Sequence, residues 1–213
     1  MAAELNFDDL NTLGFDAFAE SYYEVMEITP KQKRDRVRLS KKLNELMLFI
    51  FTLIEEQKSR NLIDRDFLLK QFRDDLTPIV IAEVRPRDKK QNAYVDKYIN
   101  DMPDDVLYAT MLGVGAYWLS KERAASIALN EANTIRNYGD LLDAMRKGFT
   151  RKQWLTMGDM KVRPTHEAVD SVIKPIDGYF EVGGELMLYP HDYVNCNNPA
   201  ELVNCRCSLA YVR

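Results

Sequence analysis

The chain has 213 residues, which is enough for one domain with a sizeable core or for two small domains. Its composition is 46% hydrophobic and 29% charged, and this balance excludes a globally disordered protein. The net charge of −4 excludes a protein whose whole surface coats nucleic acid, because such a surface is strongly basic.

The N-terminal segment and the apolar content predict a soluble protein. Residues 1–30 carry seven acidic side chains and no Lys or Arg, whereas a secretory signal begins with basic residues and continues with an apolar run. The most apolar stretch, residues 46–54, is far shorter than the roughly 20 residues of a membrane span. We therefore expect a protein that is made in the cytoplasm and has reduced thiols. A structural disulfide is not the first expectation there.

The acidic segment is predicted to be partly helical around Phe15, Phe18 and Tyr22, and the sign of the charge reverses after it. Residues 31–42 carry seven basic side chains and one acid. This basic run is a candidate contact with DNA phosphates. The candidate residues are Lys31, Lys33, Arg34, Arg36, Arg38, Lys41 and Lys42. The alternative, which we favour, is a solvated helix face that pairs with the acidic segment before it.

A long buried helix is predicted to begin at Thr29 and Pro30, because Thr is a favoured cap and Pro suits the first turn. Apolar side chains follow it at helical spacing. They are Leu39, Leu43, Leu46, Ile50 and Leu53, with Met47, Phe51 and Ile54 beside them. A helix that is apolar over so much of its girth is buried on more than one side. Its expected partners are other helices of this chain or a neighbouring subunit.

Further helices are predicted between residues 64 and 147. Residues 64–83 form the first, with Phe67, Leu68, Phe72 and Leu76 on one side, and Pro78 is expected to end or kink it. Residues 85–105 are expected to form a polar connector with a short helix around Tyr94 and Tyr98. A longer helical pattern runs from Asp104 to about Lys147, with expected interruptions near Gly113 and Gly115 and again near Gly139.

After Gly148 the segments become short, aromatic and β-branched, which predicts strands. Residues 180–188 are typical of a hairpin around Gly183 and Gly184, and residues 205–212 of a last strand. The predicted fold class is α+β: a mainly helical N-terminal two thirds, then a small C-terminal α+β domain with short antiparallel strands. The predicted domains are a helical region, 1–110, and a second domain, 111–213. The second consists of an entry helix over about 111–147 and an α+β part over about 150–213.

The sequence holds no phosphate-binding loop, dinucleotide fingerprint, serine-hydrolase elbow or HExxH pair, and its two histidines are His166 and His191. Cys205 and Cys207 would project to the same face of a strand, where both sulfurs could reach one zinc ion. His166, Asp159, His191 or Cys196 could complete the ligands. The alternatives are two small buried core residues, or a disulfide between Cys196 and one of the pair.

Asp159, Arg163 and His166 form a second cluster of candidate residues. A carboxylate that orients a histidine is the arrangement of a general base. The alternative is a structural arrangement in which Asp and Arg pair and hold a turn, and this alternative is the commoner one. Trp154 is expected in the core.

The C-terminal part resembles the C-terminal domain of phage head-morphogenesis proteins, the Mu F-like minor head proteins of tailed phages and prophages. The resemblance covers about residues 120–211, and its elements follow one another in the order of the family. The matching positions are Lys152 and Trp154; Asp159, Arg163 and His166; Pro175, Ile176, Asp177 and Phe180; Gly183, Gly184, Pro190 and Asp192; and Asn204, Cys205, Arg206 and Cys207. Arg123, Glu131 and Asn133 also resemble positions of the helix that enters this domain.

The resemblance implies a minor structural protein of the phage head, without enzymatic activity, made in the host bacterial cytoplasm and carried in the virion. It implies the portal protein or the major capsid protein as partners, with packaged DNA as a further contact and no membrane. Self-association through the N-terminal helices is a further expectation.

The paired cysteines recur in this family together with the Asp-Arg-His core, which implies a shared site that is zinc-bound or hydrogen-bonded. The alternative function is a metal-dependent hydrolase or a toxin-like nuclease that uses Asp159, His166, Cys205 and Cys207. A closed site with four ligands would indicate a structural metal, whereas three ligands and an open cleft would favour catalysis.

Overall fold

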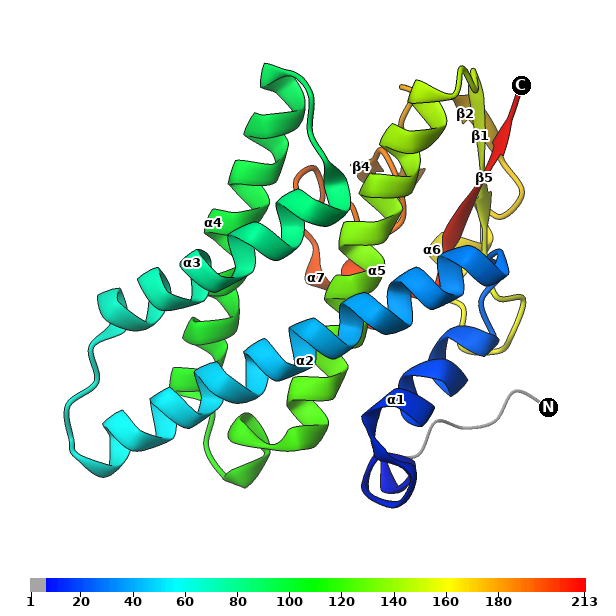
Figure 1. The fold of residues 1–213 in the computed structure, drawn as a ribbon. Helices are drawn as coiled ribbons and strands as arrows, with labels where there is room; N and C mark the ends of the chain where they lie inside the picture. Colours follow the sequence, from blue (N-terminus) through cyan, green and yellow to red (C-terminus); the bar gives the residue numbers. More distant parts are fainter. Residues whose placement is uncertain (1–6) are drawn as a thin grey trace.

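The computed structural model describes residues 7–213 and confirms the α+β class (Figure 1). Helices dominate the first two thirds: α1 (Asp8–Glu24), α2 (Pro30–Ser59), α3 (Arg65–Val84), α4 (Lys89–Leu112), the 3-10 helix η1 (Ala116–Leu119) and α5 (Lys121–Arg146). The remainder holds β1 (Arg151–Leu155), α6 (Pro164–Glu167), β2 (Ile173–Pro175), β3 (Phe180–Val182), β4 (Glu185–Met187), α7 (Pro199–Leu202) and β5 (Ser208–Val212). None of these helices combines the length and apolar content that a membrane span requires.

Helix α2 begins as predicted. The Thr29 side chain accepts a hydrogen bond from the Gln32 amide, and the Gln32 side chain accepts one from the Thr29 amide, which is a capping box. Its apolar residues from Leu39 to Ile54 are buried, except that Leu48 and Leu53 are half-buried and Phe49 is exposed. The helix packs against α1, α3 and α5, so its wide apolar stripe is covered within this chain.

Helix α3 has the predicted length, whereas helix α4 is longer than predicted. Pro78 does not end α3, which continues to Val84, because Val80 and Val84 are buried in the core beyond the proline. Residues 89–112 form one helix, where a polar connector and a short helix were expected, and this helix passes through Pro103. An interior proline costs about 3 kcal/mol, and the burial of several apolar side chains on the same helix outweighs that cost.

Helix α5 lies at the centre of the molecule, between α2 and the C-terminal segments (Figure 1). The predicted break near Gly113 and Gly115 is present, but the break near Gly139 is wrong, since α5 is continuous to Arg146. A Cβ atom at Gly139 would lie 3.1 Å from the Glu83 carbonyl oxygen of α3. The glycine therefore allows two helices to approach closely and does not interrupt α5.

The C-terminal strands form two small antiparallel sheets. In the first, the strand order is β2-β1-β5, and Trp154 of β1 lies opposite Leu209 of β5. In the second, β3 and β4 form the predicted hairpin, and Gly183 and Gly184 both have positive φ values, of 61° and 86°. Two consecutive residues with positive φ are what a tight two-residue hairpin turn requires, and glycine adopts them most readily.

The last strand is shorter than predicted. It begins at Ser208, so Cys205 and Cys207 lie in the loop before β5 and do not alternate along a strand. The physical reason is that β1 ends opposite Ser208, and the Cys205 and Cys207 carbonyls accept hydrogen bonds from side chains of α5 instead of a strand. One continuous hydrophobic core joins the helices to the C-terminal part. The boundary expected at residues 110 and 111 falls inside α4, and the division into two domains stays a prediction.

Candidate functional site

Three side chains with metal-ligand chemistry meet in the interior of the C-terminal part. His166 lies on α6, and Cys205 and Cys207 lie in the loop before β5. The His166 Nδ1 atom is 3.4 Å from the Cys207 Sγ atom and 3.5 Å from the Cys205 Sγ atom. All three residues are buried, and their ligand atoms lie within 4.8 Å of one another. The structure thus brings together three of the six candidate ligands that the sequence offered for a metal site.

The second ring nitrogen of His166 contacts Glu201 of α7. The His166 Nε2 atom is 3.0 Å from the Glu201 Oε2 atom, which also accepts a hydrogen bond from the Thr165 hydroxyl. Because an ionised carboxylate only accepts hydrogen bonds, this contact favours the ring tautomer with the proton on Nε2. The lone pair of Nδ1 then faces the two sulfurs. Sequence reasoning missed Glu201, since no local pattern links it to a histidine 35 positions away.

The hairpin turn makes room for the Glu201 carboxylate. Gly183 has a φ of 61°, and a Cβ atom at this position would overlap the Glu201 side chain. Glycine is therefore needed at Gly183 for two reasons, the backbone conformation and the close approach of Glu201. This contact gives the glycine-rich hairpin a direct structural connection to His166.

The cysteine loop is held by a hydrogen-bond network that reaches into the N-terminal helices. The Asn133 side-chain amide lies 3.5 Å from the Cys205 carbonyl oxygen and 3.4 Å from that of Cys207. The Asn137 amide donates to the Pro190 carbonyl at 2.9 Å and lies 3.4 Å from the Cys207 carbonyl. These two asparagines are one helical turn apart on α5, so they share the face that meets the loop.

Arg36 of α2 orients both asparagines. Its Nε atom donates to the Asn133 Oδ1 atom at 2.9 Å, and its Nη2 atom donates to the Asn137 Oδ1 atom at 2.7 Å. Its Nη1 atom forms an ion pair with Asp140 at 3.1 Å. Arg36 is fully buried. The guanidinium therefore fixes both asparagines with their amide groups turned towards the cysteine loop.

The two thiols of the cluster are electrostatically unequal. Burial alone would raise the pKa of Cys205, but the hydrogen bond from Cys207 and the nearby His191 and His166 outweigh burial and hold that pKa well below its usual value. The hydrogen bond to Cys205, together with burial, raises the pKa of Cys207. The hydrogen bond between the two thiols therefore couples their ionisation.

Asp159 lies outside the cluster of three ligands. It does pair with an arginine, but its partner is Arg206, whose Nη2 atom lies 3.0 and 2.7 Å from the two carboxylate oxygens. Arg163, the partner suggested by the sequence, donates instead to the Val203 carbonyl. The carboxylate that orients His166 belongs to Glu201. Asp159 and Arg163 thus hold the loops around the cluster.

The other candidate residues of the C-terminal part surround this cluster. The Trp154 ring lies edge-on to His166 at 5.8 Å and to Phe180 at 5.2 Å between ring centroids, and Trp154 and Phe180 are both buried. Asn204 adopts a φ of 58°, and its amide donates to the Asn130 side chain. Asp177 is exposed. His191 is buried and contacts the Cys205 carbonyl, whereas Cys196 lies apart, against Asn198.

Lys152, two residues before Trp154 on β1, is expected to make the stability of the protein depend on pH. It is fully buried and donates to the Leu188 carbonyl at 2.7 Å. Burial lowers its pKa to about 7, although Asp192 and Asp177 oppose the change. The unfolded chain keeps this proton to higher pH, so between about pH 7 and 10 the unfolded state binds more protons. Lys152 therefore makes the free energy of unfolding rise with pH in that window, by up to about 1.4 kcal/mol per pH unit.

The measurement compares urea unfolding of the wild type and Lys152→Met at pH 7 and pH 9. We expect the stability difference between the two proteins to change in favour of the wild type as pH rises. Lys174→Met is the matched control, because Lys174 lies opposite Lys152 on β2 and is only half-buried. A difference for Lys152→Met that stays constant between the two pH values would contradict the prediction.

Most of the candidate DNA-binding residues have partners within the chain. Ion pairs join Lys31 to Asp35, Lys33 to Glu24, Arg36 to Asp140, Arg38 to Glu83 and Lys41 to Asp16. Two of these pairs, at Lys33 and Lys41, reach the acidic segment of α1, as the alternative interpretation expects. Arg34 and Lys42 are exposed. Contact with DNA through this run stays a prediction.

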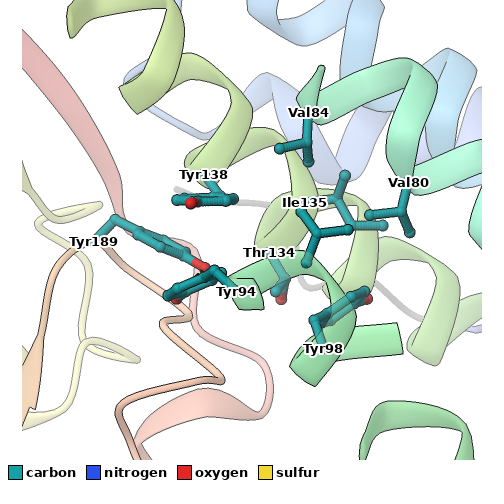
Figure 2. Close-up of a pocket in the computed structure, with 9 residues that line it drawn as sticks. Val80, Val84, Tyr94, Tyr98, Thr134, Ile135, Tyr138 and Tyr189 are labelled. Atoms are coloured by element: carbon teal, nitrogen blue, oxygen red, sulfur yellow. Dashed lines mark hydrogen bonds between the residues drawn. The ribbon is translucent and has the colours of Figure 1, made fainter. Parts of the chain in front are cut away.

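The structure has two small cavities in or near the family-like C-terminal part, one beside the His166 cluster and one among the helices. One, of about 20 Å³, lies beside the cluster and is lined by Met157, Lys161, Val162, Arg163, His166, Asn204, Cys205, Arg206 and Cys207. The other, of about 10 Å³, lies among α3, α4 and α5 (Figure 2). There Tyr138 stacks on Tyr94 at 4.2 Å and on Tyr189 at 5.4 Å, which ties the helices to the C-terminal part.

Comparison with known proteins gives one match. A family model described as Phage Mu protein F like protein matches residues 84–210. This range includes His166, Glu201, Cys205 and Cys207, and it excludes Arg36. Searches of curated proteins and of solved structures gave no match.

Proposed function

Because this chain belongs to the Phage Mu protein F like family, whose model matches more than half of its residues, we propose that it is a minor structural protein of a tailed-phage or prophage head. Membership of this family indicates a phage head morphogenesis protein and a component of the virion. The finer role that we propose is capsid assembly at the portal and the capsid interior. The family match is the observation that carries the proposal.

The enclosed form of the His166 cluster supports a structural role over an enzymatic one. All three side chains are buried, and the cavity of about 20 Å³ beside them has room for a water molecule or an ion. Substrate pockets are larger, at about 300–1,000 Å³. A hydrolase or nuclease would need a cleft that its substrate can enter, so this geometry does not favour the catalytic alternative.

Exposed apolar side chains at two turns of the helical part offer a surface for a protein partner. Leu62 and Ile63 lie between α2 and α3, and Leu112 and Val114 lie at the end of α4 and just beyond it. Leu62 is 71% exposed and Val114 is 93% exposed. Both turns lie at the end of the helical part away from the sheet (Figure 1). We propose that the portal protein or the major capsid protein covers these turns.

Self-association and DNA contact would each use a defined part of the N-terminal helices. The apolar stripe of α2 is covered inside the chain, so self-association through the N-terminal helices would use the same exposed turns. Contact with packaged DNA would rest on Arg34 and Lys42, since the other basic residues of the run are ion-paired.

The test is quantitative mass spectrometry of purified heads from a phage that encodes this chain, combined with co-purification of the chain and the portal protein of that phage. We expect far fewer copies of the chain than of the major capsid protein, and a stable complex with the portal. The double variant Leu62→Asp with Val114→Asp is expected to lose the complex and keep its fold. Leu186→Asp is the matched control, because Leu186 is 56% exposed on the distant hairpin.

Absence of the chain from purified heads would contradict the structural role. Loss of the complex in the Leu186→Asp control would remove the assignment of the surface to the two turns. Cleavage of DNA or of an ester substrate by the purified protein, lost in His166→Ala, would establish the enzymatic alternative.

A further inference from the structure

We infer that His166, Cys205 and Cys207 bind one zinc ion through the His166 Nδ1 atom and two thiolates, with a water molecule at the fourth position. The inference rests on the geometry of the cluster and does not depend on a role in the phage head. The site holds α6 against the cysteine loop, two segments that share no strand pairing.

The separations between the His166 nitrogen and the two sulfurs fit a tetrahedral zinc ion. Zinc bonds of about 2.3 Å to sulfur and about 2.0–2.1 Å to nitrogen, at the tetrahedral angle, place the nitrogen about 3.6 Å from each sulfur. The His166 Nδ1 atom lies 3.4 and 3.5 Å from the two sulfurs. An ion placed between these three atoms would require only small movements of the side chains.

The approach of both sulfurs to one ring nitrogen is also the arrangement that a shared metal ion requires. With the proton on Nε2, the Nδ1 atom has a single lone pair, which accepts one hydrogen bond and not two. Both thiols approach that atom at nearly the same distance, and without a metal Cys207 donates to Cys205 instead. A metal ion replaces the thiol protons and satisfies all three ligand atoms at once. The Cys207 amide, 3.5 Å from the Cys205 sulfur, would donate to the thiolate.

The surroundings are those of a metal-binding histidine. Such histidines commonly donate their other ring N–H to a carboxylate, as His166 does to Glu201. Two thiolates and a neutral imidazole around a divalent cation give no net charge, which lowers the cost of burying the site. The ligand types also favour zinc, because thiolates and imidazole suit it better than magnesium or calcium.

The fourth position has no protein ligand among residues 7–213. No other His, Cys, Asp or Glu in this range joins the three ligands, and Asp159 is held by Arg206. The cavity of about 20 Å³ lies beside the same three residues and has room for one water molecule. We therefore assign the fourth position to water.

The test uses the full chain, purified in reducing buffer without a metal-affinity tag and analysed for zinc by elemental analysis. We expect about one zinc ion per chain. Replacement of zinc by cobalt is expected to produce thiolate-to-cobalt charge-transfer absorption and the visible bands of a tetrahedral site. Cys205→Ser, Cys207→Ser and His166→Ala are each expected to lose both signals.

Two variants serve as controls, and a third tests the surroundings. Cys196→Ser removes the buried cysteine that lies outside the cluster, and Asp159→Asn removes the carboxylate paired with Arg206; both should keep the zinc. Glu201→Gln keeps every ligand but weakens the acceptor for His166, so zinc affinity should fall by roughly 10–100-fold. This partial loss separates a supporting residue from a ligand even where a ligand variant fails to fold.

Three results would overturn the inference. One is a folded wild type that carries no zinc, gives no cobalt charge-transfer band and melts at the same temperature with and without a chelator. Another is a mass lower by two hydrogens, because a disulfide between any two of Cys196, Cys205 and Cys207 removes at least one of the two metal-binding thiolates. The last is loss of zinc in Cys196→Ser or Asp159→Asn equal to that in Cys205→Ser, because the ligand set would then be different.

Discussion

Replacing Arg36 by methionine is expected to lower the free energy of unfolding by about 3–5 kcal/mol, the usual cost of breaking a buried ionic network. Arg36 is fully buried and donates to Asn133, Asn137 and Asp140. Methionine fills part of the same volume but has no N–H groups. Two buried amide oxygens would lose their donor, and each unsatisfied group costs about 1–3 kcal/mol.

The measurement is urea unfolding followed by circular dichroism, with Arg34→Met as the matched control. Arg34 precedes Arg36 on α2 and is exposed, so its replacement should change stability by no more than about 0.5 kcal/mol. Arg36→Lys should also be destabilising, since one ammonium group cannot reproduce the planar set of donors. Equal stability of Arg36→Met and Arg34→Met would refute the assigned role.

Arg36 also supports the part of the chain that matches the family. Residue 36 lies outside the matched range, residues 84–210, yet its side chain orients the asparagines that hold the cysteine loop. Further contacts run the same way, from Tyr23 to the Leu129 carbonyl and from Ser208 to the Glu27 carbonyl. The N-terminal helices therefore stabilise the site as well as covering α5.

Replacing Trp154 by alanine is expected to cost about 3–5 kcal/mol, as for other large aromatic side chains in protein cores. Trp154 is fully buried at the centre of the small sheet, with its ring edge-on to Phe180 and His166. Alanine would leave a cavity next to His166 that the surrounding strands cannot fill. We expect loss of stability together with a looser His166 cluster.

The matched control for Trp154→Ala is Trp118→Ala, because the chain has two tryptophans and Trp118 is only half-buried. Urea unfolding followed by circular dichroism should show a smaller decrease in the free energy of unfolding for Trp118→Ala than for Trp154→Ala. The rate at which a thiol reagent labels Cys205 and Cys207 reports on the cluster, and it should increase in Trp154→Ala alone. If Trp154→Ala lowers the free energy of unfolding no more than Trp118→Ala does, the sheet is not packed around the Trp154 ring.

Features that depend on a few neighbouring residues were predictable from the sequence. The cap at Thr29, the buried stripe of α2 and the hairpin at Gly183 and Gly184 all occur as expected. Each arises from local physics: a side chain that reaches its own helix end, a helical repeat, or a turn that needs positive φ. The resemblance to the Mu F-like family was likewise carried by residue order and is confirmed by the family match.

Features that depend on distant partners required the tertiary structure. Pro103 and Gly139 normally disfavour a helix, but burial and close helix contact outweigh their local cost. Arg36 belongs to a basic run whose other members are polar surface residues, and only the packing of α2 on α5 makes it a buried hydrogen-bond donor. The pairing of His166 with Glu201 was invisible for the same reason. The sequence by itself determined the cap and apolar stripe of α2, the hairpin turn and which residues have metal-ligand chemistry, whereas long-range packing decided where α4 and α5 continue and which of those residues meet.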